Sequence, residues 1–361
     1  MLEATIAAEL RAANIPGGTV AVVHRDGRMD AVAVGLADVR AGRRATPDTA
    51  YHLFSGTKLF TATAVLQLVE QGRVTLDAPA TTYLPDVLGG CRATVRHLLS
   101  HTSGLRDTLR AFLSVHPAGE APLGTAGALR RYRIRVRRPP GERVEYRNVN
   151  YALLGELVTR VAGQPYAAYV AEHVLAPLAM PVAFTVTDAM RPDVATGYVG
   201  AWEPLRYLTP WLVPSMRGRL YGGRVGGVLE VRPVDPDTAA IGGLVGSAVG
   251  FLPFALAHLT DGGPVLGADS VRRMQTLGAR GAAGVVSRAG VGIGWKLGQV
   301  GDIPFLNHEG GGPGFTSETR LYPDEGLGLV VCLNRWIMPT RSHLVAHRVC
   351  EAARRAFARR R

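Results

Sequence analysis

Runs of β-forming residues lie near both ends of the 361-residue chain, and helical patterns and loops fill its middle. Thr19–His24 and Met29–Leu36 are joined by a turn containing Asp26-Gly27, a strong hairpin signal. Three more strands are predicted near the C-terminus: Gly292–Gln299, Phe315–Tyr322 and Gly328–Asn334. Strands so divided predict an α+β (α/β sandwich) fold, in which terminal helices flank a central antiparallel sheet and a mostly helical domain is inserted.

Apolar residues at helical spacing predict where the helices lie. Thr57–Gln71 stops at Gly72 and Asn150–Val161 stops before Gly163, and glycine favours the left-handed conformation that ends many helices. The other predicted helices are residues 2–13, Val95–Leu99 and Ser342–Arg359. The predicted domains are a sheet domain, residues 1–78 and 240–361, and a mostly helical domain with irregular loops, residues 79–239. Within the second, residues 201–240 are rich in Gly, Pro and aromatics and are predicted to be irregular.

Ser55 and Lys58 form a Ser-x-x-Lys pair at the start of a predicted helix. Three positions apart, the two side chains share one helix face. A serine hydroxyl needs a base before it becomes a good nucleophile, and a partly desolvated lysine can serve. The free N–H groups of a helix N-terminus also suit a developing oxyanion. By itself this short pair fits an ordinary helix start equally well, with Ser55 as the N-cap and Lys58 in solvent.

The flanking sequence favours the catalytic interpretation. Six segments resemble the superfamily of class C β-lactamases, DD-peptidases and family VIII esterases, in the family's order: Phe54–Asp77, Tyr83–Asp86, Thr94–Leu105, Pro140–Gly155, Gly242–Ser247 and His308–Phe315. The resemblance covers residues 15–335 and implies an active site in a cleft between the two domains. It implies covalent catalysis by Ser55, without a metal or organic cofactor.

The family's second motif, Tyr-x-Asn, is Tyr146-Arg147-Asn148 here. The resemblance implies that Tyr146 relays the Ser55 proton and later activates water or another acceptor. A phenol near a cation is held closer to its ionised form, which agrees with that role. Asn148 is implied to hydrogen-bond Lys58 and the substrate. Arg147 departs from the usual small residue, and either projects outward or adds a cation at the mouth of the cleft.

The third motif is His308-Glu309-Gly310, of the His-x-Gly type found in esterases and amidases of the family rather than Lys-Thr-Gly. On a strand, His308 and Gly310 face one side and Glu309 the other. His308 is therefore predicted to line the cleft, with Glu309 behind the sheet. The resemblance implies that the N–H groups of Gly311 and Ser55 hold the oxyanion. Gly310 is expected to let the substrate approach the strand closely.

Composition narrows the remaining classes of function. The net charge of +12 comes mainly from scattered Arg residues without a nucleic-acid-binding motif, so no nucleic-acid partner is expected. Three cysteines without CxxC spacing suggest neither disulfides nor a metal site. The pairs His97/His101 and His343/His347 have zinc-like i, i+4 spacing but no obvious third ligand. The first ten residues do not resemble a signal peptide, and no apolar run would span a membrane, so a cytoplasmic location without membrane partners is expected.

The predicted function is hydrolysis of a small ester or amide through a Ser55 acyl-enzyme. The alternatives are acyl transfer in a biosynthetic pathway, DD-peptidase or β-lactamase activity, and a non-catalytic homologue. Sequence leaves the acyl group, the acceptor and the oligomeric state open. Five aromatics are candidates for shaping the substrate pocket, although loop cores also need aromatics: Trp202, Tyr207, Trp211, Tyr221 and Trp295.

Overall fold

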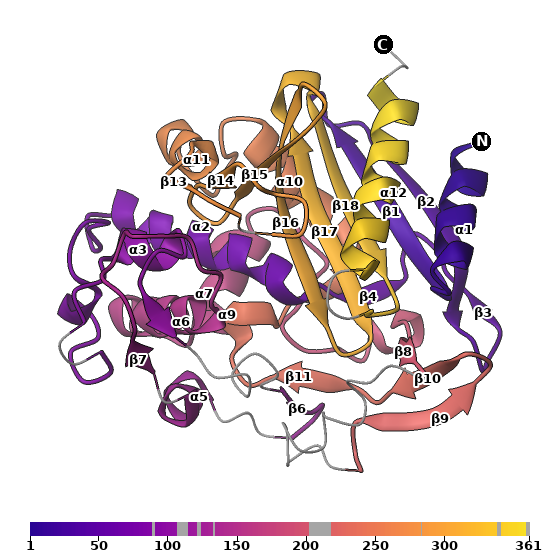
Figure 1. Cartoon of the computed structure of the whole chain (residues 1–361), viewed down its shortest axis with the longest axis horizontal. Coiled ribbons are helices and arrows are strands. Elements are labelled where there is room, and N and C mark those ends of the chain that lie inside the picture. The colour runs from indigo at the N-terminus through magenta and orange to yellow at the C-terminus, as the bar shows by residue number, and fades with distance from the viewer. Residues whose placement is uncertain are drawn as a thin grey trace.

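The computed structural model describes residues 1–88, 91–106, 115–120, 124–132, 134–201, 218–282, 284–337 and 341–358. Its central feature is a nine-stranded sheet in the order β13-β14-β15-β16-β17-β18-β1-β2-β3, in which every neighbouring pair is antiparallel (Figure 1). The strands are β1 (Gly17–His24), β2 (Met29–Asp38), β3 (Arg43–Arg44), β13 (Ala279–Arg280), β14 (Gly290–Val291), β15 (Lys296–Val300), β16 (Ile303–Gly312), β17 (Phe315–Tyr322) and β18 (Leu327–Leu333).

The sheet joins the two ends of the chain, as predicted. β1 lies between β2 and β18, so Val20 is opposite Val32 on one side and Val331 on the other. The largest difference from the predicted strand boundaries is at the start of β15. β15 begins at Lys296 rather than Gly292, because the Gly292 N–H donates to the Trp295 carbonyl (2.9 Å) and Gly294 has a φ of 79°. That turn needs a left-handed residue and cannot continue a strand.

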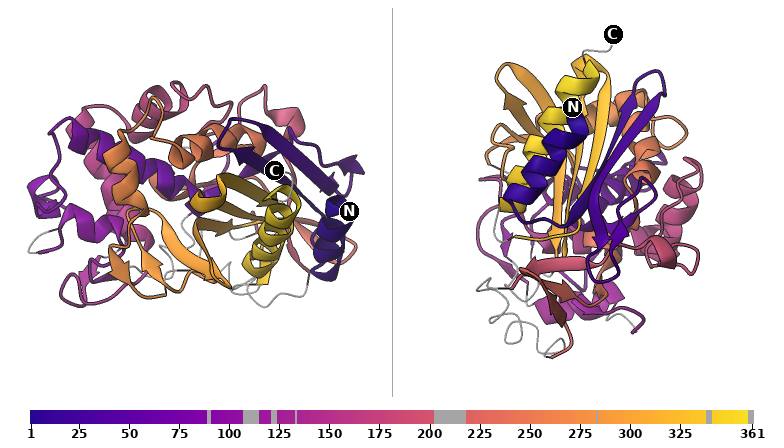
Figure 2. Two further views of the ribbon diagram at one scale, coloured as in Figure 1. Left: turned by 90° about the horizontal axis from the view of Figure 1, so that it is seen from above. Right: turned by 90° about the vertical axis from the view of Figure 1, so that its right-hand side faces the viewer.

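Helices cover both faces of the sheet (Figure 2). α1 (Leu2–Ala12) and α12 (Arg341–Ala358) pack together on one face, and α2 (Thr57–Glu70) and α10 (Leu252–Leu259) contribute to the core on the other. Alternation along β1 divides its side chains between the two: Val20 and Val22 join the α1–α12 core, and Ala21 and Val23 join the other.

The segment between β4 and β12 carries most of the remaining helices. Its largest is α6, whose side chains are buried from Asn148 to Leu154 and which packs against α2. The other elements are β4 (Ala50–His52), η1 (Phe54–Gly56), η2 (Ala80–Thr82), α3 (Val95–Leu99), β5 (Leu105–Arg106), β6 (Val115–Pro117), α5 (Gly124–Tyr132), β7 (Arg135–Val136), α6 (Asn148–Ala162), α7 (Tyr166–Val170), η3 (Ala171–Leu175), η4 (Arg191–Asp193), β8 (Gly197–Gly200), β9 (Tyr221–Val225), β10 (Val228–Val231), β11 (Val234–Pro236), α9 (Ala239–Gly242), β12 (Val245–Ser247), η6 (Val249–Phe251), α11 (Ala268–Gln275) and η7 (Pro323–Glu325).

Among the described residues, no helix is both long enough and apolar enough to cross a membrane.

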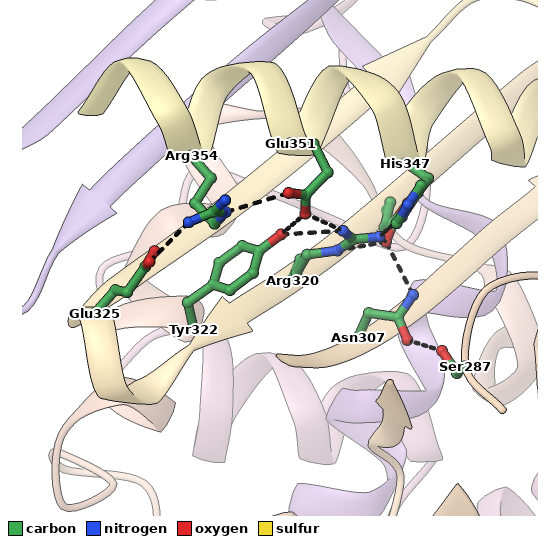
Figure 3. A network of polar contacts seen from close by, with 9 residues as sticks. Ser287, Asn307, Arg320, Tyr322, Glu325, His347, Glu351 and Arg354 are labelled. Atoms are coloured by element: carbon green, nitrogen blue, oxygen red, sulfur yellow. Dashed lines mark hydrogen bonds and ion pairs between the residues drawn. The ribbon is translucent and has the colours of Figure 1, made fainter. Parts of the chain in front are cut away.

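A buried polar network fixes α12 to the sheet (Figure 3). Arg320 of β17 has no exposed side-chain area and forms ion pairs with Glu318 and with Glu351 of α12, the latter at 3.1 Å. The Tyr322 hydroxyl donates to the same Glu351 carboxylate, and Asn307 Nδ2 donates to Glu318 (2.9 Å). Charges this deep are tolerated only when each finds a partner, so the network sets how the helix seats on the strands.

Candidate active site

Ser55 and Lys58 meet where η1 runs into α2. Lys58 Nζ donates to Ser55 Oγ (3.0 Å) and to the Ile241 carbonyl (2.9 Å). Lys58 has no exposed area, whereas Ser55 keeps partial access. A buried lysine within hydrogen-bond distance of an accessible hydroxyl is positioned to take part in proton transfer from that hydroxyl.

Ser55 is presented by a strained turn. Phe54, the residue before it, has a φ of 46°, which is uncommon for a side chain of that size. Glycines make room for the strained residue, since a Cβ on Gly242 would lie 3.2 Å from the Phe54 Cα and one on Gly312 would lie 2.6 Å from its ring. The turn therefore depends on close approach by α9 and β16.

His101 holds the loop that carries Tyr146. The His101 carbonyl accepts the Glu145 N–H (2.8 Å), and His101 Nδ1 accepts the Arg147 N–H (3.2 Å). Tyr146 lies in the sequence between these two bonded residues, and the centre of its ring is 4.5 Å from the centre of the His101 ring. The Tyr146 ring is thereby kept beside Lys58, whose Nζ is 5.2 Å from the ring centre.

The other two residues of the second motif differ in their setting. Asn148 begins α6, lines the same pocket as Ser55, and has a buried Oδ1 without a hydrogen bond. An amide oxygen in that state is available to a ligand donor. Arg147 is about one-third exposed and lies 3.4 Å from Glu145, so its charge is paired within its own loop.

His308 is fully buried on β16 and lies beside Tyr146, with ring centres 6.1 Å apart. Burial, and then the positive charges of Lys296 and Lys58, hold the pKa of His308 well below its usual range, so the imidazole is neutral. Nδ1 lies 2.9 Å from the Glu309 carbonyl, which can only accept, so Nδ1 carries the proton. Nε2 is buried without a protein hydrogen bond and keeps its lone pair.

Glycines at the end of β16 allow the strand to press against η1. A Cβ on Gly310 would lie 2.1 Å from the Leu53 carbonyl oxygen, whereas one on Gly311 would point the other way, 2.9 Å from the side chains of His343 and Trp336. Protein atoms in and next to η1 occupy the space in front of Gly310, and its place in the substrate site stays a prediction. Gly311 does line the pocket with Ser55. Its role as second oxyanion donor stays a prediction.

The pocket is narrow and mixed in character. It is lined by Phe54, Ser55, Val115, Asn148, Pro236, Ile241, Gly242, Gly311, Gly312, Pro313 and Trp336. Trp336 was absent from the candidate aromatics, and Trp295 takes the alternative role, a place in the core. Trp295 has no exposed area, and its Nε1 donates to His258 in the core (3.3 Å). Tyr221 packs against the cluster that contains Val115 and Trp336, and Trp202, Tyr207 and Trp211 lie outside the described residues.

Sequence reasoning also missed Lys296. Its Nζ forms a buried ion pair with Glu309 and lies 4.7 Å from the centre of the Tyr146 ring. A single lysine in a strand matches no motif. Only the pairing of β15 with β16, which sets Lys296 opposite Asn307 and near Glu309, brings it to the site.

The first histidine pair with zinc-like spacing, His97 and His101, has other partners. His97 forms a capping box with Thr94 at the start of α3, and His101 holds the Tyr146 loop. Within the described part of the chain, no group of three or more His, Cys, Asp or Glu side chains is arranged to hold a metal ion. The three cysteines are all buried and free.

The chain is similar to known proteins over most of its length. The model of the Beta-lactamase family matches residues 2–353. The D-aminopeptidase of Brucella ovis is 34% identical over 188 residues, which are 51% of this chain and 36% of that protein. The chain matches about half or less of the length of the curated relatives it resembles.

Two solved structures share the fold. D-amino acid amidase from Ochrobactrum anthropi SV3, complexed with D-phenylalanine, aligns over 99% of this chain and 100% of its own with a TM-score of 0.83 and 24% identity. SurE, solved with D-Leu, aligns over 97% of this chain and 74% of its own with a TM-score of 0.69 and 27% identity.

Proposed function

The chain belongs to the β-lactamase family, and from that premise we propose that it hydrolyses a small ester or amide through an acyl-enzyme on Ser55. Family membership and the D-aminopeptidase relative support a serine hydrolase. The observation that carries the choice of nucleophile is the 3.0 Å contact between Lys58 Nζ and Ser55 Oγ, made by a lysine without solvent contact.

In the proposed reaction, Ser55 Oγ attacks the substrate carbonyl while its proton passes to the Lys58–Tyr146 pair. The N–H groups of Ser55 and Gly311 bind the oxyanion, and collapse of the tetrahedral intermediate expels the alcohol or amine, which takes the proton. Water then attacks the acyl-enzyme with the same pair as base, and Ser55 regains its proton. Neutral His308 offers its Nε2 lone pair to a donor on Tyr146 or on the substrate.

The proposed acyl group is small, because the pocket beside Ser55 is narrow. The names of two relatives suggest where to begin: one is a D-aminopeptidase, and SurE was solved with D-Leu. We therefore include esters and amides of D-amino acids among the substrates to test. Acyl transfer uses the same acyl-enzyme and differs only in what attacks it, so it remains an alternative within this proposal.

Labelling with a fluorophosphonate, read as a mass shift on the peptide that contains Ser55, tests the nucleophile. We expect stoichiometric labelling of the wild-type protein and none of Ser55→Ala. An unlabelled Ser55 in folded wild-type protein would favour the non-catalytic alternative.

Turnover is then measured with p-nitrophenyl esters of graded chain length and with D- and L-aminoacyl p-nitroanilides, with and without amine or alcohol acceptors. Hydrolysis is expected to release free acid at a rate independent of the acceptor. Release that requires an acceptor, with the acyl group recovered on it, would replace hydrolysis by acyl transfer.

A further inference from the structure

The chain contains only two lysines, Lys58 and Lys296, beside 39 arginines. Both are buried, with 0% and 5% of their surface exposed. The ammonium group is compact and sits on a flexible stem, whereas the guanidinium group is planar and larger. In a chain that otherwise uses arginine for its cations, a second buried lysine singles out this position.

Both lysines converge on the same phenol. Lys58 Nζ comes from α2 and lies 5.2 Å from the centre of the Tyr146 ring, and Lys296 Nζ comes from β15 and lies 4.7 Å from it. Cations within about 6 Å of an aromatic ring are attracted to it, and burial strengthens the interaction. Two ammonium groups, one from α2 and one from β15, thus lie beside the Tyr146 ring.

Glu309 fixes the second ammonium in place. Burial would raise the pKa of Glu309, but its ion pair with Lys296 outweighs that effect and lowers the pKa to about 2. The other carboxylate oxygen accepts the Val285 N–H (3.0 Å), and a Cβ on Gly284 would lie only 2.5 Å from it. The 284–285 loop therefore closes directly over the carboxylate and leaves Lys296 little freedom to turn away.

We propose that Lys296, held by Glu309, is a positioning residue that acts through Tyr146 by stabilising negative charge on its phenol. The inference rests on the proposed function, because it assigns Lys296 to the same proton path. When the Ser55 proton moves toward the Lys58–Tyr146 pair, a fixed positive charge beside the ring keeps the basic form of the pair available at lower pH.

The other ionisable groups around Tyr146 do not supply this charge. His101 and His308 face the ring, and burial is the main cause that holds both of their pKa values well below the usual range. Tyr151 of α6 is a buried phenol whose pKa burial raises. On the loop of Tyr146 itself, Arg147 is paired with Glu145. Among the described residues, the two ammonium groups and Glu309 therefore determine the local charge.

The test compares pH profiles of kcat/KM for a p-nitrophenyl ester. Lys296→Met is expected to raise the apparent pKa of the low-pH limb by about one pH unit. The value of kcat/KM near neutral pH then falls roughly tenfold and recovers at higher pH. Lys296→Arg keeps the charge and is the matched control, expected to leave the limb near its wild-type position. In a Tyr146→Phe background, Lys296→Met is expected to move the limb no further, because the phenol through which it acts is gone.

A second variant guards against misfolding. Lys296→Met leaves Glu309 buried without a partner, so the double variant Lys296→Met/Glu309→Gln removes both charges. It is expected to fold and to shift the limb in the same direction but by less, because the carboxylate near the phenol is removed as well. Ser55 labelling counts the active sites in each preparation. A double variant that is fully labelled and keeps the wild-type limb overturns the inference, and so does a shift that persists in Tyr146→Phe. Wild-type protein that is not labelled overturns the proposed function instead.

Discussion

Lys58 differs from a lysine at an ordinary helix N-terminus because it is buried. An exposed lysine three residues after a serine would be solvated, and a contact between the two would contribute little. Here no part of Lys58 reaches solvent, and Ser55 lies inside η1 rather than at the cap of α2, which is Gly56. The alternative in which Ser55 merely caps the helix does not fit that geometry.

Substitutions at three residues test the proposed proton path. Ser55→Ala is expected to abolish turnover because it removes the attacking oxygen. Lys58→Ala and Tyr146→Phe are each expected to lower kcat by about 10² to 10⁴, the usual contribution of an acid–base group. Steady-state rates on a good ester substrate measure this, and near-wild-type activity of Ser55→Ala would contradict the assignment of the nucleophile.

The charge of His308 bears on β-lactam substrates. In β-lactamases of this superfamily, a lysine at the third motif supplies a cation for the substrate carboxylate. Here His308 is neutral, Lys296 does not line the pocket that contains Ser55, and Arg147 is paired with Glu145. We therefore expect nitrocefin turnover and cleavage of peptides ending in D-Ala-D-Ala to be slow or absent, compared with ester hydrolysis by the same preparation. Efficient turnover of either would contradict this.

At the scale of secondary-structure elements, the attachment of α12 to the sheet depends on Arg320. Arg320→Met is expected to lower the free energy of unfolding by about 3–5 kcal/mol, because it leaves the buried Glu318 carboxylate without its arginine partner and removes one of the two arginines that pair with Glu351, the other being Arg354. Arg348→Met on the outer side of α12 removes a partly exposed ion pair with Glu9 and is the matched control, expected to cost about 0–1 kcal/mol. Urea unfolding measures both, and equal effects would show that burial does not set the difference.

Several elements were predictable because local pattern and tertiary packing agree. The hairpin of β1 and β2, helix α2 and helix α12 lie within two or three residues of their predicted bounds. The strained φ of Phe54 and the approach of Lys296 to Tyr146 were not predictable. Each is fixed by residues distant in sequence, as when Glu309 and the 284–285 loop fix Lys296. The motif residues themselves were found through resemblance.

At the scale of the whole molecule, buried neutral histidines predict sensitivity to acid. Burial lowers the pKa of His52 to about 4 and that of His258 to about 3, and burial followed by Arg320 lowers that of His347 to about 4. The unfolded chain binds these protons near pH 6.5, so the stability they contribute is complete above that pH and is lost as pH falls toward 4.

Each of these histidines is expected to lower the free energy of unfolding by on the order of 2 kcal/mol as the pH falls from about 6.5 toward 4. Urea midpoints measured between pH 7.5 and 4.5 should therefore fall steeply, and His258→Gln should flatten the dependence while lowering stability at pH 7.5. A midpoint that is constant down to pH 4.5 would mean that these side chains become protonated without unfolding.

The pairing of β1 with β18 has a consequence for how the protein is made. At about 5–20 residues per second, a ribosome needs roughly 15 to 60 s after completing the β1–β2 hairpin before it has added β18. Through that interval the edge of β1 that will pair with β18 lacks its partner, and an isolated hairpin is marginally stable in water. Synthesis of this enzyme therefore depends on keeping a nascent N-terminal hairpin from pairing with other chains until its own last strand arrives.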